Sequence, residues 1–398
     1  MAETKKNIWN DDDGEEVQPQ KTHGFRRFLV FLLILTAVLG VVVLAAYRDG
    51  TGFDVLRRYF SYGSVEKAGG TASYTYDAAS SNRFAALGDT LVVLSNTSLQ
   101  VLGPGGEEVW STGVQMTAPA LETGGGRAVA YDVGGRSLYV VDSKGQVAAM
   151  TAAEEEPFLA ARLNREGWLA VTAGKKSYKG SVHVYDADME EIFEFKSSNR
   201  FVTDAYVTDD GKFLAAVTLG QESSVFVSNV ILYNLEKPGK AEPVGDYDVA
   251  DGLVMDIGQQ GRSLVTISDT CLTLADTEGK ITASYRYDSE YLREFDLAGD
   301  SFAVLLLNRY QSGSLGRLVT VGTDGAVIGN LDVSDEVLSV SAEGRYIAVL
   351  YTDKLVIYNQ DLAVYASLNG TGYAREVLMR PDGSALLIAG EKASLFLP

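Results

Sequence analysis

The hydrophobic residues of this chain follow a pattern that repeats about every forty residues. In each copy, a strand-like stretch of mixed character leads into a glycine-marked turn, and the turn leads into a second stretch that is almost wholly apolar. The eight marker glycines are Gly88, Gly126, Gly167, Gly211, Gly261, Gly299, Gly344 and Gly383. A period of this length, built from short strands and turns, is typical of a β-propeller, in which each blade is a four-stranded sheet.

The two ends of the repeat region complement each other. Residues 73–77 read as an isolated strand, whereas the last repeat, 375–398, contains three strands and no fourth. A first strand that completes the last sheet would close the ring and leave no exposed sheet edge. We therefore predict an all-β fold, an eight-bladed β-propeller over residues 72–398. A seven-bladed ring is the alternative, if one weak repeat is not a full sheet.

Three segments precede the predicted propeller. Residues 1–27 are polar and carry an acidic run, which predicts a disordered cytoplasmic tail. Residues 28–46 are nineteen residues without a charge and would span roughly 28 Å as a helix, which predicts one transmembrane helix. A cleavable signal peptide is the alternative, but the apolar stretch is long and its leader is acidic. A short leader and one anchor before a large domain favour an extracytoplasmic propeller.

Residues 47–71 are predicted to form a juxtamembrane amphipathic helix and a linker. Phe53, Leu56 and Phe60 share one helical face, and Arg57 and Arg58 are turned away from it. Such a helix either packs against the propeller or lies on the membrane surface. Both alternatives stay open from the sequence.

Charge and cysteine content narrow the choice of partners. The first 47 residues hold five basic and six acidic residues, so nearly all of the net charge of −19 belongs to the rest of the chain. A domain this acidic repels phosphate backbones, and no nucleic-acid partner is expected. The single cysteine, Cys271, excludes an intramolecular disulfide and a cysteine-rich metal site.

The repeats carry a family resemblance. One repeat resembles the quinoprotein-type (PQQ-like) eight-bladed motif, in the segments 106–110, 119–120 and 138–145. The whole chain resembles an uncharacterised family of membrane-anchored PQQ-like or WD40-like β-propeller proteins of Gram-positive bacteria, a domain of unknown function, through its anchor and the segments 57–60, 82–88 and 178–182. The resemblance implies the architecture and the anchor, but no activity.

No enzyme, cofactor or metal site is expected. Quinoprotein enzymes typically stack their cofactor against a vicinal cysteine pair, and this chain has Cys271 alone. His183 lies in an alternating strand, which predicts a structural histidine and not a catalytic base. The nucleophile elbow Gly-x-Ser-x-Gly does not occur in the sequence.

Four arginines recur where an innermost strand is expected to begin. The pentapeptide Ser-Ser-Asn-Arg-Phe appears at 80–84 and 197–201, and related junctions occur at 291–294 and 373–376. The arginines are Arg83, Arg200, Arg293 and Arg375. Gathered at one mouth of the central channel, they would bind a carboxylate or phosphate group. The alternative is that each pairs with a nearby acidic side chain.

Long hairpins between second and third strands are the last feature. They cover 174–180, 219–226 and 308–316, and they should share a face with the arginines. Insertions on one face of a repeat protein commonly mark its binding side. The candidate residues in them are Lys176, Tyr178, Phe226, Arg309 and Tyr310. We expect a membrane-tethered, extracytoplasmic, non-catalytic scaffold that binds a protein or peptide there. The alternative is a receptor or carrier for a small anionic or sugar-like ligand at the pore mouth.

Overall fold

The structure is a computed structural model, and the chain divides into two compact units, Met1–Leu56 and Arg57–Pro398. The residues it describes are 24–49, 54, 58, 73–222, 224–236, 242–249 and 252–398. The predicted tail, as far as residue 23, and most of the predicted juxtamembrane segment lie outside these ranges.

The first unit contains the helix α1, Gly24–Asp49, which includes the nineteen uncharged residues 28–46. The large apolar side chains described in it, from Phe28 to Val41, are exposed. Within the described ranges, no helix is both long enough and apolar enough to cross a membrane.

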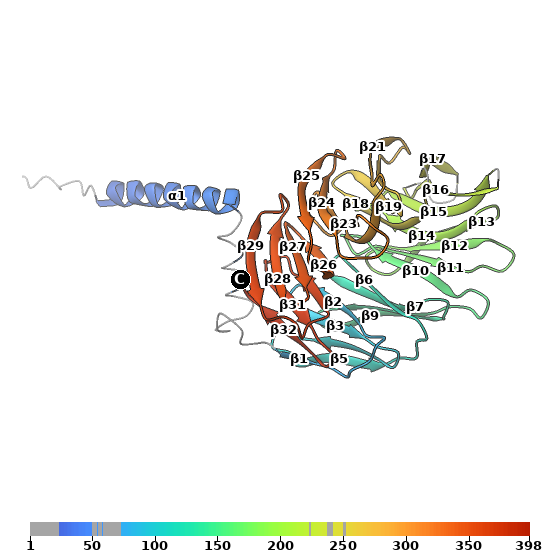
Figure 1. Cartoon of the computed structure of the whole chain (residues 1–398), viewed down its shortest axis with the longest axis horizontal. Coiled ribbons are helices and arrows are strands. Elements are labelled where there is room, and N and C mark those ends of the chain that lie inside the picture. The colour runs from blue at the N-terminus through green and yellow to red at the C-terminus, as the bar shows by residue number, and fades with distance from the viewer. Residues whose placement is uncertain are drawn as a thin grey trace, which may run out of the picture. The chain divides into compact units, whose positions relative to one another are not determined.

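The second unit consists of four-stranded antiparallel sheets arranged around an axis (Figure 1). The first sheet contains β2 (Arg83–Leu87), β3 (Thr90–Leu94), β4 (Ser98–Leu102) and β5 (Glu108–Gly113). The second contains β6 (Pro119–Gly124), β7 (Arg127–Asp132), β8 (Ser137–Asp142) and β9 (Gly145–Thr151). The third contains β10 (Phe158–Leu163), β11 (Leu169–Ala173), β12 (Gly180–Tyr185) and β13 (Glu191–Ser197). The fourth contains β14 (Phe201–Val207), β15 (Phe213–Glu222), β16 (Val225–Asn234) and β17 (Pro243–Val249).

The remaining four sheets follow the same order. The fifth contains β18 (Val254–Gln260), β19 (Ser263–Ser268), β20 (Cys271–Ala275) and β21 (Ile281–Arg286). The sixth contains β22 (Tyr291–Asp296), β23 (Phe302–Asn308), β24 (Gly316–Gly322) and β25 (Val327–Val333). The seventh contains β26 (Val337–Glu343), β27 (Tyr346–Tyr351), β28 (Lys354–Asn359) and β29 (Val364–Asn369). The eighth contains β30 (Glu376–Met379), β31 (Ala385–Ile388), β32 (Lys392–Phe396) and β1 (Ser73–Thr75).

The first and last strands of the propeller close the ring. In the eighth sheet β1 is antiparallel to β32, with Ser73 opposite Ser394 and Thr75 opposite Lys392. The prediction of eight blades closed by the N-terminal strand is therefore confirmed, and the seven-bladed alternative is wrong. Because β1 supplies the outer strand of the eighth sheet, this sheet has four strands like the other seven, and the ring is closed.

The core lies between adjacent sheets. Eight clusters of buried apolar side chains fill the eight junctions, and the second strand of each sheet is packed on both faces. All seven residues of β23 are buried, for example. This double burial explains why the second strands read as continuous apolar runs, whereas the outer strand β5 is mostly exposed.

Arg58 is one of two described residues, with Asp54, between residues 49 and 73. Its guanidinium is buried and donates to the Asp382 carbonyl at 2.9 Å and to the Tyr365 hydroxyl at 3.4 Å. The sequence placed Arg58 on the polar side of a helix. Arg58 is thus packed against the seventh and eighth sheets, and the two alternatives for the predicted amphipathic helix stay predictions.

Candidate functional site

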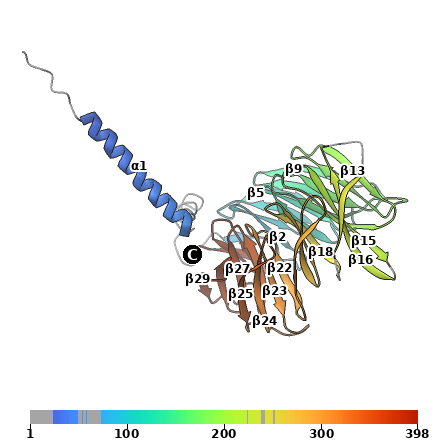
Figure 2. The ribbon, with the colours of Figure 1, turned by 90° about the horizontal axis from the view of Figure 1, so that it is seen from above.

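The propeller has two different faces, because all eight sheets run in the same up-and-down order. One face carries the starts of the first strands and the hairpins from second to third strands, such as 174–179 and 309–315. We call it the hairpin face. The opposite face carries the marker glycines, and we call it the turn face. Figure 2 shows the sheets from a second direction.

The exposed aromatic side chains of the described propeller all lie on the hairpin face. Their exposed fractions run from 45% for Tyr178 to 64% for Phe226. The six residues are Tyr178, Phe201, Phe226, Tyr291, Tyr310 and Tyr373. The other large apolar side chains that are exposed on the propeller are aliphatic or methionine, such as Val364 on the outer strand β29. Aromatic exposure is thus confined to one face.

Three of these six aromatics were predicted from the long hairpins, and three were not. Phe201, Tyr291 and Tyr373 were missed, although each is adjacent or nearly adjacent to a predicted arginine in the repeated junctions. Among the predicted basic residues of the hairpins, Lys176 lies 2.6 Å from Glu155, and Arg309 is exposed. Their role in binding stays a prediction.

One predicted hairpin differs from the expectation. The segment 219–226 was expected to be a loop, but β15 continues to Glu222 and β16 begins at Val225. Only residues 223 and 224 separate the two strands, so β15 and β16 form an extended two-stranded ribbon. The short apolar run Val225, Phe226 and Val227 suits a strand as well as a loop, and its pattern alone did not separate the two.

The four predicted arginines do not share one pocket. Arg200 is paired: it lies 2.9 Å from Glu222 and donates to the Val227 carbonyl at 2.7 Å. Arg293 lines a cavity of about 300 Å³ near the sixth-sheet hairpin. Arg375 lines a separate cavity of about 390 Å³ between β22, β26 and β30. Arg83 is exposed at the start of β2.

The channel wall below the hairpin face is acidic, which the sequence did not reveal. Five consecutive first strands contain a bulge near their start, and the residues that follow the bulges are Ala160, Asp204, Asp256, Glu294 and Ser339. A bulge re-aims the side chains that follow it. Three of the five positions carry a carboxylate, and Glu122, Asp296 and Glu376 add three more from β6, β22 and β30.

Arg162 on β10 contacts three carboxylates in one half of this wall. Its guanidinium lies 2.8 Å from Asp204, 2.7 Å from Asp256 and 3.8 Å from Glu122. Those three carboxylates belong to the fourth, fifth and second sheets, so one side chain links four blades across the channel. The channel itself forms a cavity of about 660 Å³ lined by all eight first strands.

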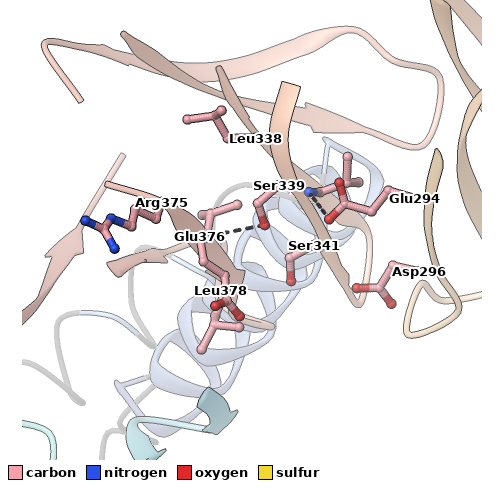
Figure 3. A pocket seen from close by; sticks show the side chains of 10 residues that line it. Glu294, Asp296, Leu338, Ser339, Ser341, Arg375, Glu376 and Leu378 are labelled. Atoms are coloured by element: carbon pink, nitrogen blue, oxygen red, sulfur yellow. Dashed lines mark hydrogen bonds between the residues drawn. The ribbon is translucent and has the colours of Figure 1, made fainter. Parts of the chain in front are cut away.

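The other half of the wall surrounds the cavity of about 390 Å³ (Figure 3). Burial raises the pKa of Glu294 to about 7, and Asp296 and Glu376 add to the rise. Burial likewise raises the pKa of Asp296 to about 6. Arg375 points away from Glu294 and Asp296 in Figure 3. These carboxylates disfavour an anionic ligand there, and a sugar-like ligand stays a prediction.

We expect the free energy of unfolding to fall as the pH rises from about 4 to about 7. The pKa values of Glu294 and Asp296 are raised from 4.5 and 3.8, so the native protein binds more protons than the unfolded chain in this range. Their stabilising contribution is complete below the unfolded values and is lost as the pH rises through the native values. Chemical denaturation of Glu294→Gln at several pH values should give a shallower decline than wild type. Parallel curves for the two proteins would contradict the assignment.

Among the described residues, no group of three or more His, Cys, Asp or Glu side chains is arranged to hold a metal ion. Each carboxylate has a different partner: Glu294 accepts from the Val340 amide, and Asp296 accepts from the Ala298 and Ala342 amides. Elsewhere, His183 lies on β12 with its Nδ1 2.8 Å from a Glu191 carboxylate oxygen, and its structural role stays a prediction.

A family model covers most of the propeller. The model of a family of unknown function, DUF5711, matches residues 61–384. The chain belongs to this family. This match confirms the predicted resemblance to an uncharacterised propeller family. Membrane anchoring and a Gram-positive source stay predictions. No curated protein matches the chain.

Solved structures similar to this DUF5711 chain are propellers with low sequence identity. The C-terminal WD40 domain of Sif2 has 11% identity and a TM-score of 0.56, covering 83% of this chain and 100% of that one. BamB from Moraxella catarrhalis has 13% identity and a TM-score of 0.50, covering 82% and 99%. The dihydro-heme d1 dehydrogenase NirN has 14% identity and a TM-score of 0.51, covering 81% and 75%. These likenesses show the fold alone, and the fold serves both a dehydrogenase and other proteins.

Proposed function

We propose that this chain is a non-catalytic scaffold whose hairpin face docks a protein or peptide partner. The observation that supports it is the confinement of the six exposed aromatic side chains of the described propeller to that face. Tyrosine and phenylalanine bury a large area on binding and lose few rotamers, and aromatic residues are enriched in protein interfaces. Scattered aliphatic exposure on the outer strands has no such meaning.

The position of the aromatics strengthens the argument. They come from four sheets, the third, fourth, sixth and eighth, so a partner that covers the channel mouth reaches several of them at once. Lys179 lies 4.5 Å from the centre of the Phe201 ring, which keeps a cation beside an exposed aromatic surface. A polar rim around aromatic anchors is the usual composition of a docking surface.

Photo-crosslinking tests this proposal. Benzoylphenylalanine placed at Tyr178, Tyr310 or Tyr373 should give adducts to one and the same protein, because the three positions surround one mouth. The same probe at Val364, which is 64% exposed on an outer strand, is the matched control and should give none of that adduct. Adducts that differ at every position, or that appear equally at Val364, would refute a common docking face.

We also propose that α1 anchors the chain in a membrane, with the propeller on the extracytoplasmic side. The support is the run of nineteen uncharged residues, 28–46, together with the exposed apolar side chains from Phe28 to Val41. Labelling of single introduced cysteines tests this proposal. The native Cys271 is only 3% exposed and should not react with the label. A membrane-impermeant maleimide should label Ser198→Cys but not Ala2→Cys in intact cells. Extraction of the protein by alkaline carbonate would contradict the anchor.

A further inference from the structure

The fourth sheet carries a ribbon that rises past its neighbouring strands. β15 and β16 have ten residues each and lie side by side, and they are yellow-green in Figure 1. The pairing of β14 ends at Phe201 opposite Leu219, and that of β17 ends at Ser228 opposite Val249. The β15–β16 pairing continues through three more pairs, from Gly220 opposite Val227 to Glu222 opposite Val225. We call residues 220–222 and 224–227 the ribbon.

Arg200 holds the ribbon from one side. Its guanidinium donates to the Val227 carbonyl on β16 at 2.7 Å and to Glu222 on β15 at 2.9 Å, so it bridges both strands. It also lies against Gly220: a Cβ there would meet the Arg200 Cζ at 2.6 Å. The side chain of Arg200 is 21% exposed and that of Glu222 is 57% exposed, so the guanidinium is largely covered while the carboxylate is open to water. Glycine at 220 is what allows this close approach.

The opposite side of the ribbon presents its aromatic residue. Side chains alternate between the two faces of a strand, and residues that pair across an antiparallel ladder share a face. Gly220 and Glu222 therefore share the Arg200 side, and Phe226, opposite Gln221, lies on the other. Phe226 is 64% exposed on that side, whereas Val225, opposite Glu222, belongs to the Arg200 side. The ribbon thus has a braced side and an open side.

We propose that the ribbon is the principal contact of the hairpin face and inserts Phe226 into an apolar pocket of a folded protein partner, with Arg200 as a positioning residue. The proposal rests on the proposed docking function and names the part of the face that carries it. We infer a folded partner from shape, because a pocket that encloses the exposed Phe226 ring is formed by a folded protein, whereas an extended peptide would pair along a strand edge instead. The Arg200–Glu222 pair also neutralises the charge of the ribbon, which suits an apolar pocket.

Bracing before binding reduces the cost of ordering the ribbon. Gly220→Ala tests this without a change at the contact itself. The added methyl group displaces the flexible end of Arg200, so the fold should tolerate it while the bridge to Val227 and Glu222 is lost. We expect an unchanged urea midpoint and faster hydrogen exchange of the ribbon amides in Gly220→Ala.

The decisive experiment combines crosslinking with a binding measurement. Benzoylphenylalanine placed at Phe226 should give one adduct to a different protein, which mass spectrometry identifies and which is then purified. Its affinity for the full chain should fall about tenfold or more for Phe226→Ser, and also for Gly220→Ala. Val364→Ser, at equal exposure on an outer strand, should leave the affinity unchanged.

The alternative occupants give other results. An adduct between two copies of this chain, or flotation with phosphatidylglycerol vesicles that Phe226→Ser abolishes, would overturn the proposal in favour of self-association or a lipid surface. Adducts from Tyr178 and Tyr310 without one from Phe226 would overturn the ribbon as principal contact and leave the docking function standing. No adduct from any of these positions would refute both.

Discussion

Arg162→Met will destabilise the propeller by about 3–5 kcal/mol near neutral pH, because it leaves buried carboxylates without their counter-charge. The side chain of Arg162 is 19% exposed, and its partners Asp204 and Asp256 are 12% and 18% exposed. Methionine retains most of the volume, so the loss reports charge and not a cavity. Urea denaturation followed by tryptophan fluorescence measures it.

The pH dependence identifies the cause. Burial raises the pKa of Asp256 to about 6 and that of Glu122 to about 7, against the lowering influence of Arg162. Protonation removes the repulsion between these groups, so the destabilisation by Arg162→Met should shrink as the pH falls from 7.5 to 5. Combining it with Asp204→Asn and Asp256→Asn should restore much of the lost stability. Arg165→Met is the matched control: Arg165 is 46% exposed, and its replacement should cost below about 1 kcal/mol.

The fold was predictable because its signals are local and repeated. Marker glycines such as Gly88 and Gly211 have positive φ values and sit in the turns where the sequence placed them. The strands that follow them are apolar because each is packed between two blades. The closing strand was also predictable. The last repeat has three strands, so the isolated strand before the first repeat could complete its sheet.

The candidate site was predictable only in part, because it depends on which blades face each other. The arginine junctions were visible, but the pairing of Arg200 with Glu222 required the register of β15 and β16. The acidic channel wall was missed for a similar reason. A bulge in the first strand decides whether Asp204 or its neighbour Thr203 faces the channel, and bulges leave little trace in a single sequence. Acidic residues inside otherwise apolar first strands were the available signal.

Tyr74→Ala will cost about 3–5 kcal/mol of unfolding free energy, because it removes the largest buried side chain of the closing strand. Tyr74 is 0% exposed and packs with Leu91, Leu102 and Leu386 between the first and eighth sheets. β1 has three residues, and Tyr74 is its one buried side chain. Loss of Tyr74 should therefore open the ring at this junction, and hydrogen exchange of the β32 amides should rise more than that of β15.

Two variants separate the contributions of Tyr74. Its hydroxyl donates to the Pro104 carbonyl at 3.1 Å and accepts from Arg380, which is itself fully buried, so Tyr74→Phe should cost about 1–3 kcal/mol. Thr75→Ala, exposed on the same strand, should change the stability by less than about 0.5 kcal/mol. If Tyr74→Ala were as mild as Thr75→Ala, the ring would not depend on its N-terminal strand. A loss confined to Tyr74→Ala would instead assign closure to the packing of one aromatic ring between the first and eighth sheets.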